Sequence, residues 1–159
     1  MPRAEEHADW ASVLEADRDE EIVVKALSGP GRGSQVLAGT AATLPAEAPF
    51  TGPYLVEPRL VAEDIDRKLY VAGGEVRGLL KPSTLTHPHV TSGEPFTPDE
   101  ELVDLALAAG RVLGVHLFGA DVLHTPGGPV VIDVNAFPGY RGVDGAPGLV
   151  AAHLREHAA

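Results

Sequence analysis

Short runs of apolar, often β-branched, residues recur along this chain between polar, glycine-rich and proline-rich stretches, a pattern typical of β-strands. Two such runs, residues 22–24 and 35–37, flank a glycine-rich stretch at residues 28–34, which predicts a hairpin with a long tip. A tighter turn is predicted at Gly73-Gly74. Further strands are predicted at residues 54–57, 69–71, 76–80, 115–123 and 129–134, and a long polar loop at residues 82–98.

Three segments have the apolar spacing of helices. Residues 8–16 carry one apolar stripe and predict a short opening helix, and residues 149–155 predict an amphipathic helix near the end. Between them, Thr97 begins a capping box with Glu100, and Gly114 ends the helix that follows. Strands that alternate with helices, mostly through hairpins, indicate an α+β fold.

The charge and composition of the chain narrow the classes of partner. Its 159 residues include 12 Lys and Arg against 23 Asp and Glu, which gives a formal net charge of -11. Binding to nucleic acid or to an anionic membrane needs a basic surface, so neither is an expected partner. The sequence shows no apolar run of membrane-spanning length and no secretory signal, and a cytoplasmic location is expected. Because cysteine is absent, any metal must be held by carboxylate, amide or imidazole groups.

The last predicted hairpin carries the sharpest chemical signal. A three-residue tip at residues 126–128 would place Asp121 opposite Asp133, and Asn135 would point to the same face because side chains alternate along a strand. Facing carboxylates repel one another unless a cation lies between them. Two carboxylates and one amide oxygen suit Mg²⁺ or Mn²⁺. The alternative is that one acid is exposed at a strand end or has a raised pKa.

A second group of residues suits an anion. Lys25 ends a predicted strand, and Gly29, Gly31 and Gly33 after it leave backbone N–H groups accessible to a phosphate. The stretch is neither a Walker loop nor a dinucleotide fingerprint, because no Lys-Ser or Lys-Thr follows it and the next element is a strand. A flexible hairpin tip is the alternative explanation for these glycines.

Other charged residues give weaker signals. Asp66 and Lys68 share one face of a strand, which by itself indicates surface charge. The seven histidines are scattered through the sequence and are predicted to be solvated. No arrangement of Ser, His and an acid for nucleophilic catalysis is identifiable.

The order of these signals resembles the ATP-grasp superfamily over roughly residues 8–158. The resemblance implies a partial ATP-grasp fold of the α+β class, with two antiparallel sheets and flanking helices. It implies a single domain, residues 1–159, truncated at its amino end, with a glycine-loop hairpin part at residues 8–54 and a metal-binding part at residues 55–159. The matching segments are Val23–Ser34 for the strand lysine and glycine loop, Leu55–Leu60 for the adenine hinge, Asp66–Gly74 for the ribose and phosphate strand, and Gly119–Leu123 with Val131–Gly139 for the metal-binding strands.

The resemblance also implies residue roles. ATP would contact Lys25, Gly29, Gly31, Arg32, Gly33, the backbone of Glu57, Pro58, Arg59 and Leu60, and, through ribose and phosphate, Asp66 and Lys68. Mg²⁺ or Mn²⁺ would be held by Asp121, Asp133 and Asn135, with Asp133 standing where many members have Glu. The loop at residues 82–97 lacks the Arg and Asn residues that glutamate ligases use near the reacting phosphate, which leaves Lys81 and Arg141 as catalytic candidates.

Within the superfamily the chain is most similar to ribosomal-protein glutamate ligases of the RimK type. This similarity implies an ATP-dependent carboxylate–amine ligase that forms an acyl phosphate on a small-molecule or peptide carboxylate. Lys68–Val71 and Phe137–Tyr140 also resemble inositol-polyphosphate kinases, although a net charge of -11 is unfavourable for a polyanionic substrate. The third hypothesis is a non-catalytic ATP-binding remnant or half of a split enzyme. In that case a partner chain or a homo-oligomer would supply the missing amino-terminal domain.

Overall fold

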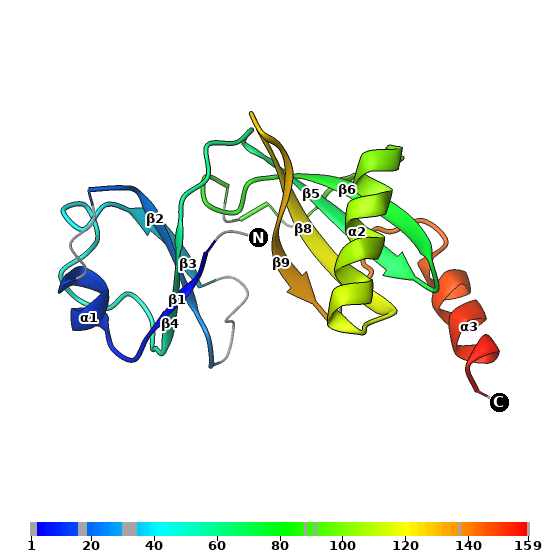
Figure 1. Cartoon of the computed structure of the whole chain (residues 1–159), viewed down its shortest axis with the longest axis horizontal. Coiled ribbons are helices and arrows are strands. Elements are labelled where there is room, and N and C mark those ends of the chain that lie inside the picture. The colour runs from blue at the N-terminus through cyan, green and yellow to red at the C-terminus, as the bar shows by residue number, and fades with distance from the viewer. Residues whose placement is uncertain are drawn as a thin grey trace. The chain divides into compact units, whose positions relative to one another are not determined.

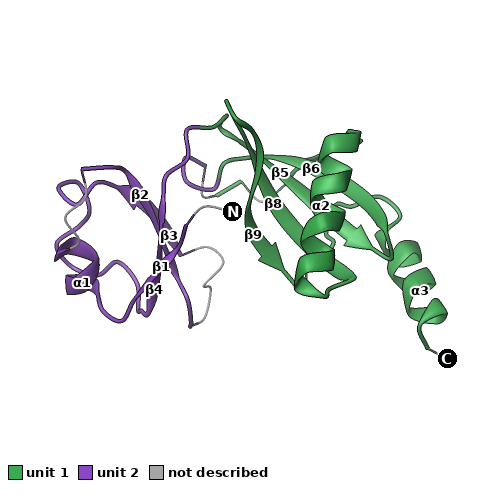
Figure 2. Cartoon of the chain, in the orientation of Figure 1, with its two compact units in different colours: residues 1, 62–83, 89–159 green, residues 2–61, 84–88 purple. Residues whose placement is uncertain are grey.

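The strands that the structure describes form two antiparallel sheets, each of which is the centre of a separate unit (Figures 1 and 2). The structure is a computed structural model that describes residues 3–15, 19–29, 35–87, 89–90, 92–136 and 138–158. Unit 2 contains the described residues of 2–61 and 84–88, and unit 1 contains those of 62–83 and 89–159. That the whole chain is one truncated domain, divided between residues 54 and 55, stays a prediction.

Unit 2 is a four-stranded sheet with one short helix. The strands β1 (Glu5–His7), β2 (Ile22–Ala26), β3 (Val36–Gly39) and β4 (Tyr54–Pro58) lie in the order β1-β4-β2-β3, and α1 spans Trp10–Glu15. The β-branched run at residues 22–24 forms the predicted strand, and residues in β2 alternate between buried and half-buried because successive side chains point to opposite faces. The core is aromatic at one end, where Trp10 lies 5.3 Å from Tyr54 between ring centroids, and the Trp10 indole N–H donates to the carbonyl of Pro45 at 2.9 Å.

Unit 1 is a five-stranded sheet in the order β7-β6-β5-β8-β9. Its strands are β5 (Ile65–Ala72), β6 (Glu75–Pro82), β7 (Glu94–Phe96), β8 (Leu117–Thr125) and β9 (Gly128–Asn135), and its helices are α2 (Glu100–Leu113) and α3 (Ala146–Glu156). One face of the sheet is apolar and packs on α2, with Leu69, Phe118 and Val122 against Leu102 and Ala106. Because side chains alternate along a strand, the opposite face receives the polar residues.

Two short strands lie where none is predicted. β1 precedes the opening helix, and β7 lies within the predicted loop at residues 82–98. Both strands are only three residues long and pair with an existing sheet edge. Such edge pairing depends on a partner strand that is distant in the sequence, so local alternation does not reveal it. Among the helices that the structure describes, none combines the length and the apolar character needed to cross a bilayer.

The start of α2 differs from the predicted capping box. The N-cap is Asp99, whose carboxylate accepts a hydrogen bond from the Leu102 N–H at 2.9 Å, so the prediction that Thr97 caps the helix is wrong. Asp caps a helix as well as Thr does, and the helix begins two residues later than the capping-box pattern predicts. The predicted end is confirmed, because Gly114 is left-handed with a φ of 66° and its N–H donates to the Gly110 carbonyl.

Replacing the cap tests this assignment. We expect Asp99→Ala to lower the free energy of unfolding by about 1 kcal/mol, since the Leu102 N–H loses its acceptor. Thr97→Ala is the matched control and is expected to change stability by less than about 0.5 kcal/mol. Urea unfolding followed by circular dichroism measures both variants, and a larger loss from Thr97→Ala than from Asp99→Ala would contradict the cap.

The hairpin of β8 and β9 has the predicted pairing of Asp121 with Asp133, but its turn and its register differ from the prediction. Thr125 pairs with Gly128, so the predicted three-residue tip is wrong and the turn is one residue shorter. The register then shifts between Val122, which pairs with Val131, and Asp121, which pairs with Asp133. Ile132 is the extra residue of this β-bulge. The bulge compensates for the shorter turn, and the predicted pairing of Asp121 with Asp133 is confirmed.

Candidate functional site

A row of charged residues crosses the polar face of the unit 1 sheet. The row consists of residues that lie directly opposite one another on adjacent strands. The pairs are Lys81 with Asp66, Lys68 with Asp121, and Asp121 with Asp133. Residues directly opposite one another in an antiparallel ladder project to the same face. The row therefore runs through β6, β5, β8 and β9, and we call these five residues the polar row.

The centre of the polar row is an ion pair between Lys68 and Asp121. The Lys68 Nζ lies 2.5 Å from Asp121 Oδ2 and 3.9 Å from Asp66 Oδ2. Burial by itself lowers the pKa of Lys68, but the neighbouring carboxylates of Asp121 and Asp66 outweigh it, so the pKa is raised above its ordinary value. Lys68 is therefore a fixed cation at neutral pH, placed between two acids.

Lys81 and Arg141 add positive charge beside this centre. Burial lowers the pKa of the half-buried Lys81, and the charge of Lys68 lowers it further, with a smaller contribution from Arg141. The catalytic candidates Lys81 and Arg141 are thus close enough to interact electrostatically, and Lys68 also acts on Lys81. Arg141 is exposed and follows Tyr140, a residue with a positive φ of 47° whose hydroxyl donates to the Val71 carbonyl at 2.8 Å.

Tyr140 is a positioning residue that the sequence patterns did not indicate. Its ring lies 5.6 Å from that of Tyr70 and packs on a small core formed by Leu79, Val143 and Ala146. This packing fixes the segment that carries Arg141 onto the sheet. The Phe137–Tyr140 motif was the available signal, although residue 137 itself lies outside the described part of the chain.

The predicted metal ligands lie at the β9 end of the polar row. Asp121 is half-buried, whereas Asp133 and Asn135 are exposed. Asn135 pairs with Gly119, two positions from the Asp121 pair, so Asp121, Asp133 and Asn135 share one face. Two carboxylates and an amide oxygen form a donor set of hard oxygen ligands, which fits Mg²⁺. In this structure the charge of Asp121 is balanced by Lys68.

Unit 2 holds the other predicted nucleotide ligands. Lys25 Nζ lies 2.6 Å from Glu57 Oε2, and the Glu57 side chain is only 5% exposed. This buried ion pair joins β2 to β4, and the sequence patterns did not indicate it. Pro58, Arg59 and Gly29 are exposed and Leu60 is half-buried, whereas Gly31, Arg32 and Gly33 lie outside the described residues. Arg59 pairs with Glu21 at 3.0 Å in a more exposed ion pair.

One prediction about the histidines is wrong. His153 is 8% exposed and is therefore buried, not solvated. It lies on α3, whose predicted range of residues 149–155 is extended to Ala146–Glu156 in the structure.

Comparison with known proteins shows similarity to one family model and to curated and solved relatives. Residues 68–156, more than half of the chain, match the family model described as the inositol 1,3,4-trisphosphate 5/6-kinase ATP-grasp domain. A probable alpha-L-glutamate ligase of Methanococcoides burtonii is 30% identical over 142 residues, which cover 80% of this chain and 46% of that protein. The chain thus spans about half the length of this curated relative.

Two solved structures share the fold over nearly the whole chain. The ATP-grasp ligase PsnB, in complex with a variant of its minimal precursor, Mg and ADP, has a TM-score of 0.67 and 21% identity, covering 98% of this chain and 52% of that one. An ATP-grasp RimK domain protein from Sphaerobacter thermophilus has a TM-score of 0.62 and 25% identity, covering 98% of this chain and 60% of that one.

Proposed function

Since the chain belongs to the ATP-grasp family and has the partial ATP-grasp fold of its relatives, we propose that it binds Mg-ATP as part of a carboxylate–amine ligase. The observation that supports the proposal most strongly is the polar row. It places the facing acids Asp121 and Asp133 beside the fixed cation Lys68 on one sheet face. A metal-bound polyphosphate needs this combination of oxygen ligands and positive charge.

In this proposal, Asp121, Asp133 and Asn135 would hold Mg²⁺, which would offset the negative charge of the phosphate groups. Lys68 and Lys81 contact phosphate, and Arg141 contributes charge near the transferring group. Asp66 binds the ribose. For unit 2 we keep the roles implied by the resemblance: Lys25 and the glycine stretch for phosphate or adenine, and the backbone of residues 57–60 for adenine.

The proposed chemistry is phosphoryl transfer followed by acyl transfer. A carboxylate oxygen attacks the γ-phosphorus of ATP, the bond from that phosphorus to the β–γ bridging oxygen breaks, and ADP leaves. The nitrogen of an amine then attacks the acyl carbon, inorganic phosphate leaves with the bonding electron pair, and the nitrogen loses a proton. The side chains contribute positioning and electrostatic stabilisation rather than a covalent intermediate.

The relatives suggest the substrate classes. One relative is named for glutamate ligation, and PsnB is a ligase solved with its precursor. We therefore propose glutamate as the amine and a peptide carboxylate as the acceptor. The cytoplasm, which supplies ATP and Mg²⁺, is the compartment that we propose for this reaction.

Hydroxylamine trapping tests the ligase proposal. An acyl phosphate reacts with hydroxylamine to give a hydroxamate, so we expect a hydroxamate when the chain, Mg-ATP and peptide carboxylates are incubated with hydroxylamine in place of glutamate. ADP release is measured in parallel, with and without each acceptor. Calorimetry of Mg-ATP binding to the same preparation establishes that the nucleotide site is intact.

The outcomes separate the three hypotheses. ADP release that depends on an inositol phosphate, without hydroxamate, would favour the kinase named in the matched family description. Mg-ATP binding with ADP release at background for every acceptor would favour a non-catalytic binding module or half of a split enzyme. No Mg-ATP binding at all would contradict the assignment of the polar row.

A further inference from the structure

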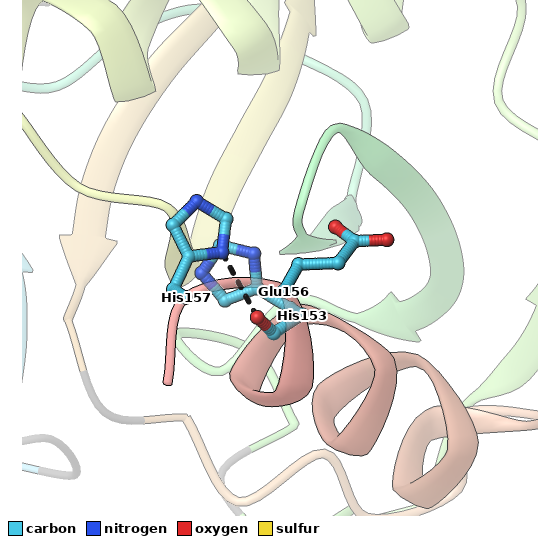
Figure 3. Close-up of side chains that lie close together, drawn as sticks. All are labelled: His153, Glu156 and His157. Carbon is cyan, nitrogen blue, oxygen red and sulfur yellow. Dashed lines mark hydrogen bonds between the residues drawn. The ribbon is translucent and has the colours of Figure 1, made fainter. Parts of the chain in front are cut away.

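The carboxyl end of α3 gathers side chains that the proposed ligase chemistry does not use. His153, Glu156 and His157 are spaced by three and four residues, which places them on one face of the helix end. Each offers one ligand atom, and these atoms all lie within 4.8 Å of one another (Figure 3). The two imidazole ring centroids are 4.2 Å apart. We call these three residues the α3 cluster.

A third imidazole reaches the α3 cluster from the sheet. His116, directly before β8, has its ring centroid 6.0 Å from that of His153 and 6.3 Å from that of His157. The backbone of His116 is held next to the β5–β6 turn, because the Gly73 N–H donates to the His116 carbonyl at 3.2 Å. Gly73 also provides space for His153, since a Cβ at position 73 would lie 2.8 Å from His153 Nδ1.

One buried ring nitrogen of the α3 cluster, on His153, lacks a hydrogen bond within the described part of the chain. Nδ1 of His153 is buried, since the residue is only 8% exposed, and it has no hydrogen-bond partner among the residues that the structure describes. A buried imidazole nitrogen without a partner is uncommon, and a bound ion or water is one of the arrangements that would satisfy it. The arrangement is therefore unlike a set of histidines that only pack together.

His157 is oriented in the way that metal-binding histidines are. Its Nδ1 lies 2.9 Å from the His153 carbonyl oxygen (Figure 3). Because a carbonyl can only accept, Nδ1 carries the proton, and the lone pair of Nε2 remains available for a cation. The carboxyl end of a helix also has a partial negative charge that favours a cation.

We propose that His153, Glu156 and His157 bind one late first-row divalent cation, with His116 as a fourth ligand. Two imidazoles and a carboxylate match the ligand types of Zn²⁺, whereas Mg²⁺ prefers oxygen ligands and keeps its waters. Ligands at about 2.1 Å in tetrahedral geometry lie roughly 3.4 Å apart, so the cluster must close slightly from its present spacing. Glu156 is exposed, and rotation of its side chain can supply this closure while His157 keeps its hydrogen bond to the His153 carbonyl.

Titration with Zn²⁺ against a chromophoric chelator, in millimolar Mg²⁺, tests the proposal on the full chain. The excess Mg²⁺ occupies sites made of oxygen ligands. The Zn²⁺ that the protein takes from the chelator therefore reports binding to sites that contain imidazole. We expect one Zn²⁺ per chain, and we expect the double variant Glu156→Ala/His157→Ala to bind it at least about tenfold more weakly. Both residues are exposed, so this variant does not depend on replacing the buried His153. His89→Ala, an exposed histidine elsewhere in unit 1, is the matched control and should bind as the natural chain does.

A second readout reports the ligands directly. Co²⁺ in a tetrahedral site with nitrogen ligands gives visible absorption bands, which we expect for the natural chain and not for the double variant. Equal Zn²⁺ binding by the natural chain and the double variant, or an equal loss in His89→Ala, would overturn the proposal. Asp133→Asn should leave Zn²⁺ binding unchanged, so failure of this site and failure of the proposed Mg-ATP site are distinguishable.

Discussion

Asp133→Asn is expected to weaken ATP binding by about a hundredfold in Mg²⁺ and to leave it nearly unchanged in EDTA. Asp133 faces Asp121 across the β8–β9 ladder, and the two carboxylates supply the charge that a divalent cation requires. Replacing one carboxylate by an amide keeps the size of the side chain and removes that charge. A hundredfold loss corresponds to about 2.7 kcal/mol of binding free energy. Calorimetry with ATP in the two buffers measures the difference.

Asp104→Asn is the matched control for this experiment. Asp104 is an exposed acid on α2, and its replacement changes the net charge of unit 1 by the same amount. We expect its ATP affinity to equal that of the natural chain in both buffers. If Asp133→Asn loses equal affinity in Mg²⁺ and in EDTA, its carboxylate acts on the nucleotide or the fold and is not a metal ligand.

Lys25→Met is expected to lower the free energy of unfolding by about 3 kcal/mol. The substitution removes the partner of Glu57, whose side chain is 5% exposed, and so leaves a buried carboxylate without its counter-ion. Breaking a buried ion pair by removing one partner typically costs about 3–5 kcal/mol. The partial exposure of Lys25, at 23%, places the expected value at the low end of this range. Chemical denaturation of the single variant measures the loss.

Two further variants separate the ion pair from other effects. Lys25→Met/Glu57→Gln removes both charges and is expected to recover about half or more of the lost stability, because no unpaired charge remains buried. Arg59→Ala breaks the more exposed pair with Glu21 at the end of the same sheet and should cost less than about 1 kcal/mol. If Arg59→Ala and Lys25→Met lowered the free energy of unfolding by similar amounts, burial of the Lys25–Glu57 pair would not explain the loss.

The elements of this chain that depend on local patterning could be predicted from the sequence. The hairpins of β5 with β6 and of β8 with β9 follow from apolar runs on either side of glycine turns, because each strand pairs with its neighbour in the chain. The stop of α2 at Gly114 likewise depends on a single local conformation. The facing of Asp121 and Asp133 was also predictable, although the structure reaches it through a shorter turn and a bulge.

The contacts that give the sites their chemistry were decided only by the tertiary structure. Lys68 and Asp121 are 53 residues apart, and their ion pair exists because β5 pairs with β8 in one particular register. The Lys25–Glu57 pair likewise requires β2 to lie beside β4.

The same division holds at the end of α3. The predicted helix ended at residue 155, so the sequence pattern did not group Glu156 and His157 with His153, whereas in the structure α3 extends to Glu156 and His157 is its C-cap. Only the packing of α3 near the β5–β6 turn buries His153 and brings His116 beside it. Periodicity shows which face a residue occupies, but burial and charge pairing depend on which distant segment covers that face. These contacts set the charge pairing of the polar row and the spacing of the side chains at the α3 cluster.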